Sequence, residues 1–198
     1  IAPRCRHLTA TDYSEKMPQK TEKNCAAIRN IRFAKADLTA LSFADGSFDL
    51  TLVLGPMYHL YEESKRIAAL SEAKRICKRV LFVTYIMNEY AIIEYAFKDN
   101  RYKEVKDKID EDFMIRDQNA LFVQTRLEEI DRLNKICGLK LIKRFTPDGP
   151  TDYMRNAINA MDDETFNAYL AFHQKTCERK ELLGAASHVV DILTKKGS

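Results

Sequence analysis

Two acidic side chains are the first candidates for binding chemistry, because each comes directly after a stretch that predicts a β-strand. Asp12 follows residues 7–11, and Asp37 follows residues 31–36. A carboxylate at the carboxyl end of a strand in an α/β sheet can accept hydrogen bonds from ribose hydroxyls or from an exocyclic amine. Two simpler interpretations stay open. Asp12 can be a helix cap or a loop carboxylate, and Asp37 can begin an Asx turn.

A third candidate region is Leu54-Gly55-Pro56, at the end of the segment FDLTLVL. Glycine lets the backbone approach a ligand closely, and Tyr58 and His59 are the first polar side chains beyond it. His59 can act as a base or orient a ligand, or it can simply cap the next helix. Tyr58 and His59 are therefore the candidate catalytic residues.

The elements that must position these residues alternate between strands and helices. FDLTLVL, residues 48–54, is apolar on nearly both faces, which predicts a strand in the middle of a parallel sheet covered by helices. Asp45-Gly46 before it favours a turn. Further expected elements are a helix over 62–78, a strand over 79–86, a helix from the capping box Thr125–Glu128 to Gly138, and strands over 139–145 and 187–195.

Two segments predict helical insertions outside the sheet. Residues 88–119 are heavily charged but carry apolar side chains at helical spacing, and residues 151–183 indicate two more helices. Tyr90 or Tyr95 can line a substrate pocket, although such aromatics are more often the buried stripe of a helix. His173 shares an apolar helix face, so we expect a packing residue rather than a metal ligand.

Four stretches together resemble the class I S-adenosylmethionine-dependent methyltransferases. They are TATDYSEKM (9–17), KADLTALSFADGSFDLTLVLGPMYHL (35–60), RIAALSEAKRICKRVLFV (66–83) and SHVVDILTKK (187–196). The resemblance implies an α/β fold with a Rossmann-like, doubly wound, mostly parallel sheet, an antiparallel C-terminal edge strand and helical cap insertions at 88–119 and 151–183. It also implies a strand and a glycine-rich loop ahead of Ile1, an N-terminal motif that this sequence does not contain.

The same resemblance implies S-adenosyl-L-methionine as the cofactor. The residues expected to bind it are Asp12, Tyr13, Met17, Asp37, Leu38, Leu54 and Gly55. Asp12 would accept hydrogen bonds from the ribose, Met17 would pack on adenine, and Asp37 with the Leu38 backbone would select the adenine ring. Tyr58 and His59 would lie on the substrate side of the pocket.

Composition limits the classes of function. A length of 198 residues, 45% hydrophobic and 31% charged, fits a single domain over residues 1–198. A net charge of +3 without a dense Lys/Arg stripe argues against a nucleic-acid partner. The five cysteines are scattered, odd in number and form no CxxC pair, which argues against disulfides and metal sites and for a cytoplasmic protein. No apolar run is long enough to span a membrane.

The resemblance implies a methyltransferase that transfers a methyl group from S-adenosylmethionine to an unidentified acceptor, and the composition favours a small molecule as that acceptor. Two alternatives stay open. The first is a non-catalytic cofactor-binding module, for example a homodimer. The second is an NAD-dependent oxidoreductase, which would need a GxGxxG loop and gives no role to the pair Asp37–Leu38.

Overall fold

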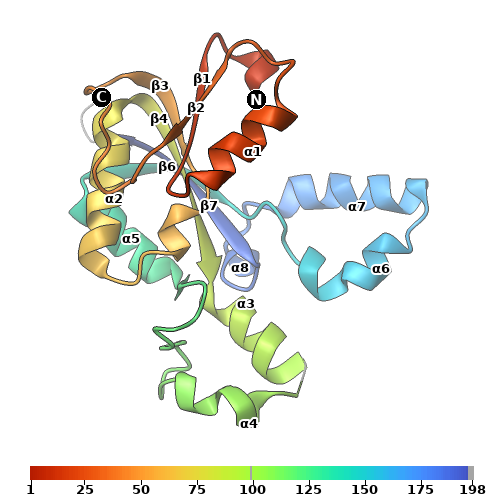
Figure 1. Ribbon diagram of the computed structural model, residues 1–198. Helices are drawn as coiled ribbons and strands as arrows, with labels where there is room; N and C mark the ends of the chain where they lie inside the picture. The colour runs from red at the N-terminus through yellow and green to blue at the C-terminus, as the bar shows by residue number, and fades with distance from the viewer. Residues whose placement is uncertain (99, 196–198) are drawn as a thin grey trace.

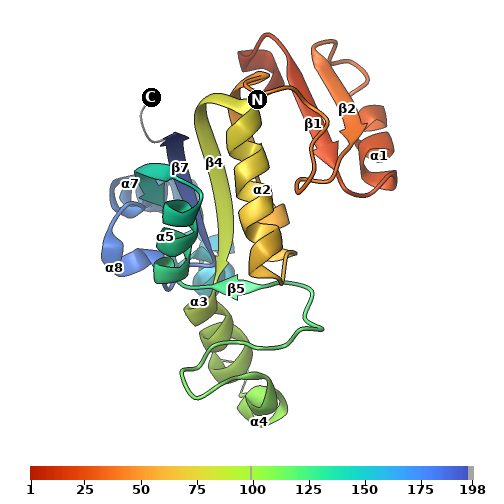
Figure 2. The same ribbon diagram turned by 90° about the vertical axis from the view of Figure 1, so that its left-hand side faces the viewer.

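The computed structural model describes residues 1–98 and 100–195, with only the backbone for residues 17–19. It is an α/β structure with two sheets (Figures 1 and 2). A short 3-10 helix, η1 (Ala2–Arg4), leads into the first sheet. In that sheet β1 (Leu8–Asp12) and β2 (Ile31–Lys35) run parallel and are connected through α1 (Lys16–Asn24). These bounds agree with the two strands that the sequence predicts.

The second sheet has five strands, four of them in one continuous row. Its order is β3 (Phe48–Val53), β4 (Cys77–Met87), β7 (His188–Lys195) and β6 (Leu139–Phe145), and β5 (Gln124–Thr125) pairs with the end of β4. β3 is parallel to β4, whereas β7 is antiparallel to both β4 and β6. The helices α2 (Glu63–Ile76) and α5 (Leu127–Ile136) lie side by side on one face of this sheet (Figure 2).

The hydrophobic core lies between these two helices and the sheet. Its fully buried members include Leu70, Leu81, Val83, Ile130, Leu133, Val189 and Leu193. They come from both helices and from two neighbouring strands, β4 and β7. Burial of such side chains stabilises the fold by roughly 1.5–3 kcal/mol each. The packing of α2 and α5 on the sheet therefore holds β4 and β7 in place.

Two helical segments extend away from the five-stranded sheet (Figure 1). The first follows β4 and comprises α3 (Asn88–Ile92), the π-helix η3 (Ile93–Lys98), α4 (Tyr102–Val105) and η4 (Lys106–Lys108). The second comprises η5 (Thr151–Met154), α6 (Arg155–Asn159), α7 (Asp163–Thr176) and α8 (Lys180–Leu183). The insertions are as predicted, but the first is helical only as far as Lys108, and the second contains more helices than the two expected.

Two details of the sheet differ from the predictions. FDLTLVL was expected in the middle of a sheet, but within the described residues β3 is hydrogen-bonded on one side only, to β4, and Leu50 is 48% exposed. The C-terminal strand was expected at the edge, but β7 lies between β4 and β6. Its Val189 and Val190 are both buried, whereas residues 140–143 of β6 are exposed and suit an edge.

The capping box predicted at Thr125–Glu128 is also wrong in detail. Thr125 belongs to β5, and its hydroxyl donates to a carboxylate oxygen of Glu129 over 2.6 Å. α5 begins at Leu127 after Arg126. Its end is as predicted, because Gly138 follows with a positive φ of 61°.

A buried ion pair joins β6 to β7. Asp191 is fully buried, and its two carboxylate oxygens accept hydrogen bonds from Arg144 over 2.5 and 2.8 Å. Asn134 of α5 donates to the same carboxylate over 2.7 Å. Arg144 and Asp191 are also partners in strand register. This contact therefore ties two strands and a helix together at one point.

Substitution of Asp191 should test this contact. We expect Asp191→Asn to lower the free energy of unfolding by about 3–5 kcal/mol, because it removes the buried charge partner of Arg144 and leaves only Asp131, whose side chain is largely exposed. Glu178→Ala is the matched control, since it breaks the exposed pair of Glu178 with Lys143 of the same strand β6 and should cost about 1 kcal/mol or less. Urea denaturation measures both, and equal losses would contradict the assignment.

Candidate active site

The parallel pairing of β1 and β2 brings the two predicted carboxylates to one edge of their sheet. Asp12 is in register with Lys35. The next residue, Ala36, donates its N–H to the carbonyl oxygen of Asp12 over 2.9 Å, and Asp37 follows directly. Ligands of α/β sheets bind outside the carboxyl ends of the strands. Asp12 and Asp37 therefore stand at neighbouring strand tips, on the edge where a ligand is expected.

Each carboxylate also stabilises its own turn. Asp12 Oδ1 accepts the N–H of Ser14 over 2.8 Å, and Asp37 Oδ1 accepts the N–H and hydroxyl of Thr39 over 2.8 and 2.7 Å. The hydrogen bonds from Thr39 hold the pKa of Asp37 below its usual range. The Asx-turn interpretation of Asp37 is thus confirmed. Within the described part of the chain, Oδ2 of either carboxylate has no hydrogen-bond partner, so each exposed side chain keeps an oxygen for a ligand.

The loop after Asp37 is fixed to α2. Leu38 packs against the main core. Glu72 accepts the N–H of Leu41 over 2.8 Å, and Arg75 donates to the carbonyl oxygens of Leu41 and Phe43 over 2.9 and 2.7 Å. These bonds connect the two-stranded sheet to the five-stranded one through α2.

The other predicted cofactor residues lie at strand tips or outside the described part. Tyr13 is 74% exposed just after β1, and Leu54 is 58% exposed just after β3. The side chain of Met17 lies outside the described residues. Gly55 has φ 132° and ψ −54°, and a Cβ added there would stand 3.5 Å from the Tyr58 hydroxyl oxygen. Position 55 therefore requires glycine.

Three aromatic rings gather beyond Gly55. The ring centroid of Tyr58 is 5.2 Å from that of His59 and 5.6 Å from that of Phe122, and the latter two are 5.3 Å apart. Phe122 comes from the segment between η4 and β5, and the N–H of the next residue, Val123, donates to the Tyr58 carbonyl over 2.8 Å. Tyr58, His59 and Phe122 form what we call the aromatic cluster.

His59 does not cap the next helix, α2. α2 begins at Glu63 with Glu62 as its N-cap residue, three positions further on. Instead, His59 Nδ1 lies 3.2 Å from the carbonyl oxygen of Leu121. The His59 ring is exposed.

Two residues that the sequence analysis missed complete this region. His188 begins β7, and its Nδ1 lies 2.6 Å from Asp148 Oδ2. Asp148 Oδ1 accepts the backbone N–H of His188 over 3.2 Å. The His188 ring centroid is 6.3 Å from that of Tyr58. The hydrogen bond with Asp148 raises the pKa of His188 above its usual value, against the opposing effect of burial.

Asp148 itself is held by a tight loop. The hydroxyl of Thr146, which is 1% exposed, donates to Asp148 Oδ1 over 2.9 Å and accepts the N–H of Gly149 over 2.8 Å. Gly149 has φ 53°, and a Cβ there would lie 3.0 Å from a ring atom of His173. His173 Nε2 lies 3.1 Å from the carbonyl oxygen of Pro147. His173 is thus a packing residue, as predicted.

The two tyrosines considered for a pocket lie in different environments. Tyr90 is 6% exposed, with its ring centroid 5.2 Å from that of Tyr153, and burial raises its pKa. Tyr95 is 53% exposed. The interpretation of Tyr90 as part of a buried stripe is confirmed.

Comparison with known proteins supports a methyltransferase. Residues 1–79 match the family model described as a methyltransferase domain. A SAM-dependent methyltransferase from Methanosarcina mazei is 14% identical, with a TM-score of 0.60 over 96% of this chain and 82% of that chain. Magnesium protoporphyrin IX methyltransferase from Synechocystis PCC 6803, solved with bound SAH, is 14% identical, with a TM-score of 0.55 over 98% and 67%. A possible histamine N-methyltransferase from Thermotoga maritima is 22% identical, with a TM-score of 0.54 over 96% and 73%.

The N-terminal part of the chain thus resembles a methyltransferase domain, and the whole chain shares its fold with S-adenosylmethionine-dependent methyltransferases of known structure. The domain match and structural neighbours such as the one solved with bound SAH support an enzyme that uses S-adenosylmethionine. No curated protein sequence matches it.

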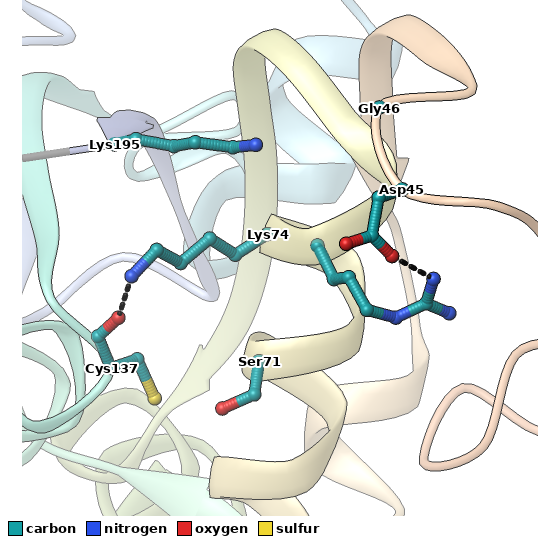
Figure 3. Close-up of a pocket in the computed structure, with 7 residues that line it drawn as sticks. Asp45, Gly46, Ser71, Lys74, Cys137 and Lys195 are labelled. Carbon is teal, nitrogen blue, oxygen red and sulfur yellow. Dashed lines mark hydrogen bonds and ion pairs between the residues drawn. The ribbon is translucent and has the colours of Figure 1, made fainter. Parts of the chain in front are cut away.

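The structure also has a cavity of about 500 Å³ at the opposite edge of the five-stranded sheet. Figure 3 shows Lys74 and Lys195 beside it, with Lys74 donating to the carbonyl of Cys137 over 2.8 Å. Lys195 ends β7, the antiparallel strand that His188 begins, so the cavity lies at the amino ends of the parallel strands. That is the wrong edge for a cofactor in this fold.

Other features of the described residues bear on the earlier expectations. All five cysteines are described, and none forms a disulfide. Across residues 1–98 and 100–195, no group of three or more His, Cys, Asp or Glu side chains is arranged to hold a metal ion. No described helix is both long enough and apolar enough to cross a bilayer.

The pairing of His188 with Asp148 predicts how the pKa of His188 changes when the carboxylate is removed. In Asp148→Asn the pKa of His188 should fall, because the carboxylate that favours the imidazolium is gone, so His188 should lose its proton at a lower pH than in the native chain. An NMR titration of the histidine ring protons measures this. Asp152→Asn should lower the pKa less, since Asp152 acts only through its charge. An unchanged His188 pKa in Asp148→Asn would contradict the pairing.

Proposed function

We propose that the chain transfers a methyl group from S-adenosylmethionine to a small-molecule acceptor at the edge formed by Asp12, Asp37 and Gly55. The observation that carries this proposal is the position of the two carboxylates at neighbouring strand tips, each with one oxygen available. Asp12 would accept hydrogen bonds from the ribose hydroxyls. Asp37 would accept from the adenine amine, and the Leu38 N–H would meet a ring nitrogen.

The residues at this edge fit the cofactor in charge and shape. The available carboxylate oxygens suit the hydroxyls and amine of adenosine, and position 55, whose φ of 132° favours glycine, lets the backbone approach a ligand closely. Tyr13 and Leu54 add exposed apolar surface at the same strand tips, and Met17, whose side chain is not described, stays a candidate for adenine. When bound, the cofactor supplies a methyl group on a positively charged sulfonium.

The protein's own contribution would be alignment and exclusion of water. Holding two reactants in line can provide effective molarities on the order of 10⁵ M or more. The aromatic cluster lies directly beyond Gly55 and would form the wall against which the acceptor packs. The insertions at 88–119 and 151–183 would cap this space.

Two observations favour a small molecule as the acceptor. The aromatic cluster offers ring surface on which a flat, compact molecule can stack. The net charge is only +3, and the sequence has no dense Lys/Arg stripe of the kind that binds nucleic acid. The names of two structurally similar proteins refer to small-molecule acceptors, magnesium protoporphyrin IX and histamine.

Binding of S-adenosylhomocysteine to an Asp37 variant tests the proposal. We expect Asp37→Ala to weaken binding by about 10- to 100-fold, because a hydrogen bond to a charged group contributes about 1.5–3 kcal/mol. Isothermal titration calorimetry measures this directly. Affinity retained within a few-fold would refute the role of Asp37.

Two controls separate ligand contact from turn stability and from other nucleotides. Thr39→Val removes the hydroxyl that bonds to Asp37 Oδ1 but keeps the carboxylate, so it should bind S-adenosylhomocysteine nearly as well as the native chain. NADH, titrated in parallel, should not bind; preferential binding of NADH would favour an oxidoreductase.

A further inference from the structure

We propose that His188, positioned by Asp148, is the base that removes the proton from a hydroxyl-bearing aromatic acceptor. The inference rests on the proposed function, since it assigns the substrate class of the same site. It starts from three facts: a histidine paired with a carboxylate, a ring nitrogen that has no hydrogen-bond partner among the described residues, and an adjacent aromatic cluster.

The topology brings His188 and Asp148 to the same edge as the aromatic cluster. β7 is antiparallel to β4, so its first residue, His188, pairs with Ile86 near the carboxyl end of β4. β6 is antiparallel to β7, so Asp148, which follows β6, reaches the same edge. The ring of Tyr58, which follows the end of β3, lies against that of His188. His188 and Asp148 therefore lie beside the space that an acceptor packed on Tyr58 would occupy.

The hydrogen bond to Asp148 determines which ring nitrogen can act. With its carboxylate 2.6 Å away, Nδ1 carries the proton and donates it to Asp148 Oδ2, which leaves the Nε2 lone pair as the acceptor. Among the described residues Nε2 has no hydrogen-bond partner. The His188 side chain is 33% exposed, so a ligand can reach it.

The charges that face His188 favour the protonated product. Asp148 bonds to it directly, and Asp152 acts on it through its negative charge; the ring of Tyr58 also lies beside it, with the two centroids 6.3 Å apart. His59 has a different environment, because its Nδ1 meets the backbone carbonyl of Leu121 rather than a carboxylate. Of these two histidines, His188 is the one with a carboxylate to stabilise an imidazolium.

A base at this position favours one class of acceptor. A neutral amine already has a lone pair for attack, and a carboxylate is already ionised near neutral pH. A phenolic hydroxyl, with an ordinary pKa of about 10, gains most from losing its proton before or during attack. The neighbouring rings of Tyr58 and Phe122 would hold the aromatic part of such a molecule.

In the proposed step, proton removal accompanies methyl transfer. The acceptor O–H bond breaks and its proton goes to His188 Nε2, while the oxygen's electron pair forms the new bond to the methyl carbon. The carbon–sulfur bond breaks with its electrons going to sulfur, which turns the sulfonium into a neutral thioether. The proton later leaves His188 for water.

A coloured phenol tests proton transfer without requiring turnover. 4-Nitrophenol is titrated into the full chain saturated with S-adenosylhomocysteine, at a pH where the free probe is mostly protonated, and visible absorbance reports the ionised form. We expect most of the bound probe to be ionised in the native chain. In His188→Asn the bound probe should be mostly neutral, and Asp148→Asn should lie between the two. His7→Asn, an exposed histidine at the other end of β1, should behave as the native chain.

Several results would overturn the inference. They are a bound probe that stays neutral in the native chain, an ionised fraction that His188→Asn does not change, a loss in His59→Asn instead, or no binding of the phenol. Circular dichroism of each variant shows whether it is folded, and Asp148→Asn keeps the test open if His188→Asn is not. S-adenosylhomocysteine binding is measured in the same samples. If S-adenosylhomocysteine binds but the phenol is not ionised, the inference fails and the proposed function stands. If the native chain does not bind S-adenosylhomocysteine, the proposed function itself fails.

Discussion

Parallel strand pairing is the constraint on which the candidate site depends. When neighbouring strands run in the same direction, the residues that follow them meet at one edge. Asp12 at the end of β1 and Asp37 after β2 meet in this way, and Leu54-Gly55 follows β3 at the carboxyl end of the parallel pair β3–β4. Residues far apart in the sequence thus become neighbours without any long-range contact of their own.

The antiparallel strand β7 brings its first residue to the same edge of the sheet. It enters the sheet from the opposite direction, so its first residue, rather than its last, arrives at the ligand edge. The buried pair Arg144–Asp191 sets the register of β6 against β7, and the same two strands carry Asp148 and His188 at their ends. A contact that serves stability therefore also decides whether the histidine meets its carboxylate.

Much of the framework can be predicted from the sequence because it depends on local signals. Strand tips, the Asp45-Gly46 turn and the glycine that ends α5 are read from adjacent residues. The position of a strand within a sheet is not local: β3 is as apolar as an interior strand yet pairs on one side only within the described part of the chain, and β7 lies inside rather than at the edge. His188 and Asp148 were missed because 40 positions separate them. The one feature of the sequence that could have pointed to them is that each lies at or next to the end of a predicted strand, but the direction of that strand in the sheet cannot be read from the sequence alone.

A crystal structure of the chain with S-adenosylhomocysteine is the most direct test of the central claim. The account predicts the ribose against Asp12, the adenine against Asp37 and Leu38, and the sulfur facing Tyr58. The cavity between Lys74 and Lys195, at the other end of the strands, is the alternative location. Density for the nucleoside there, or anywhere away from the tips of β1 and β2, would contradict the account.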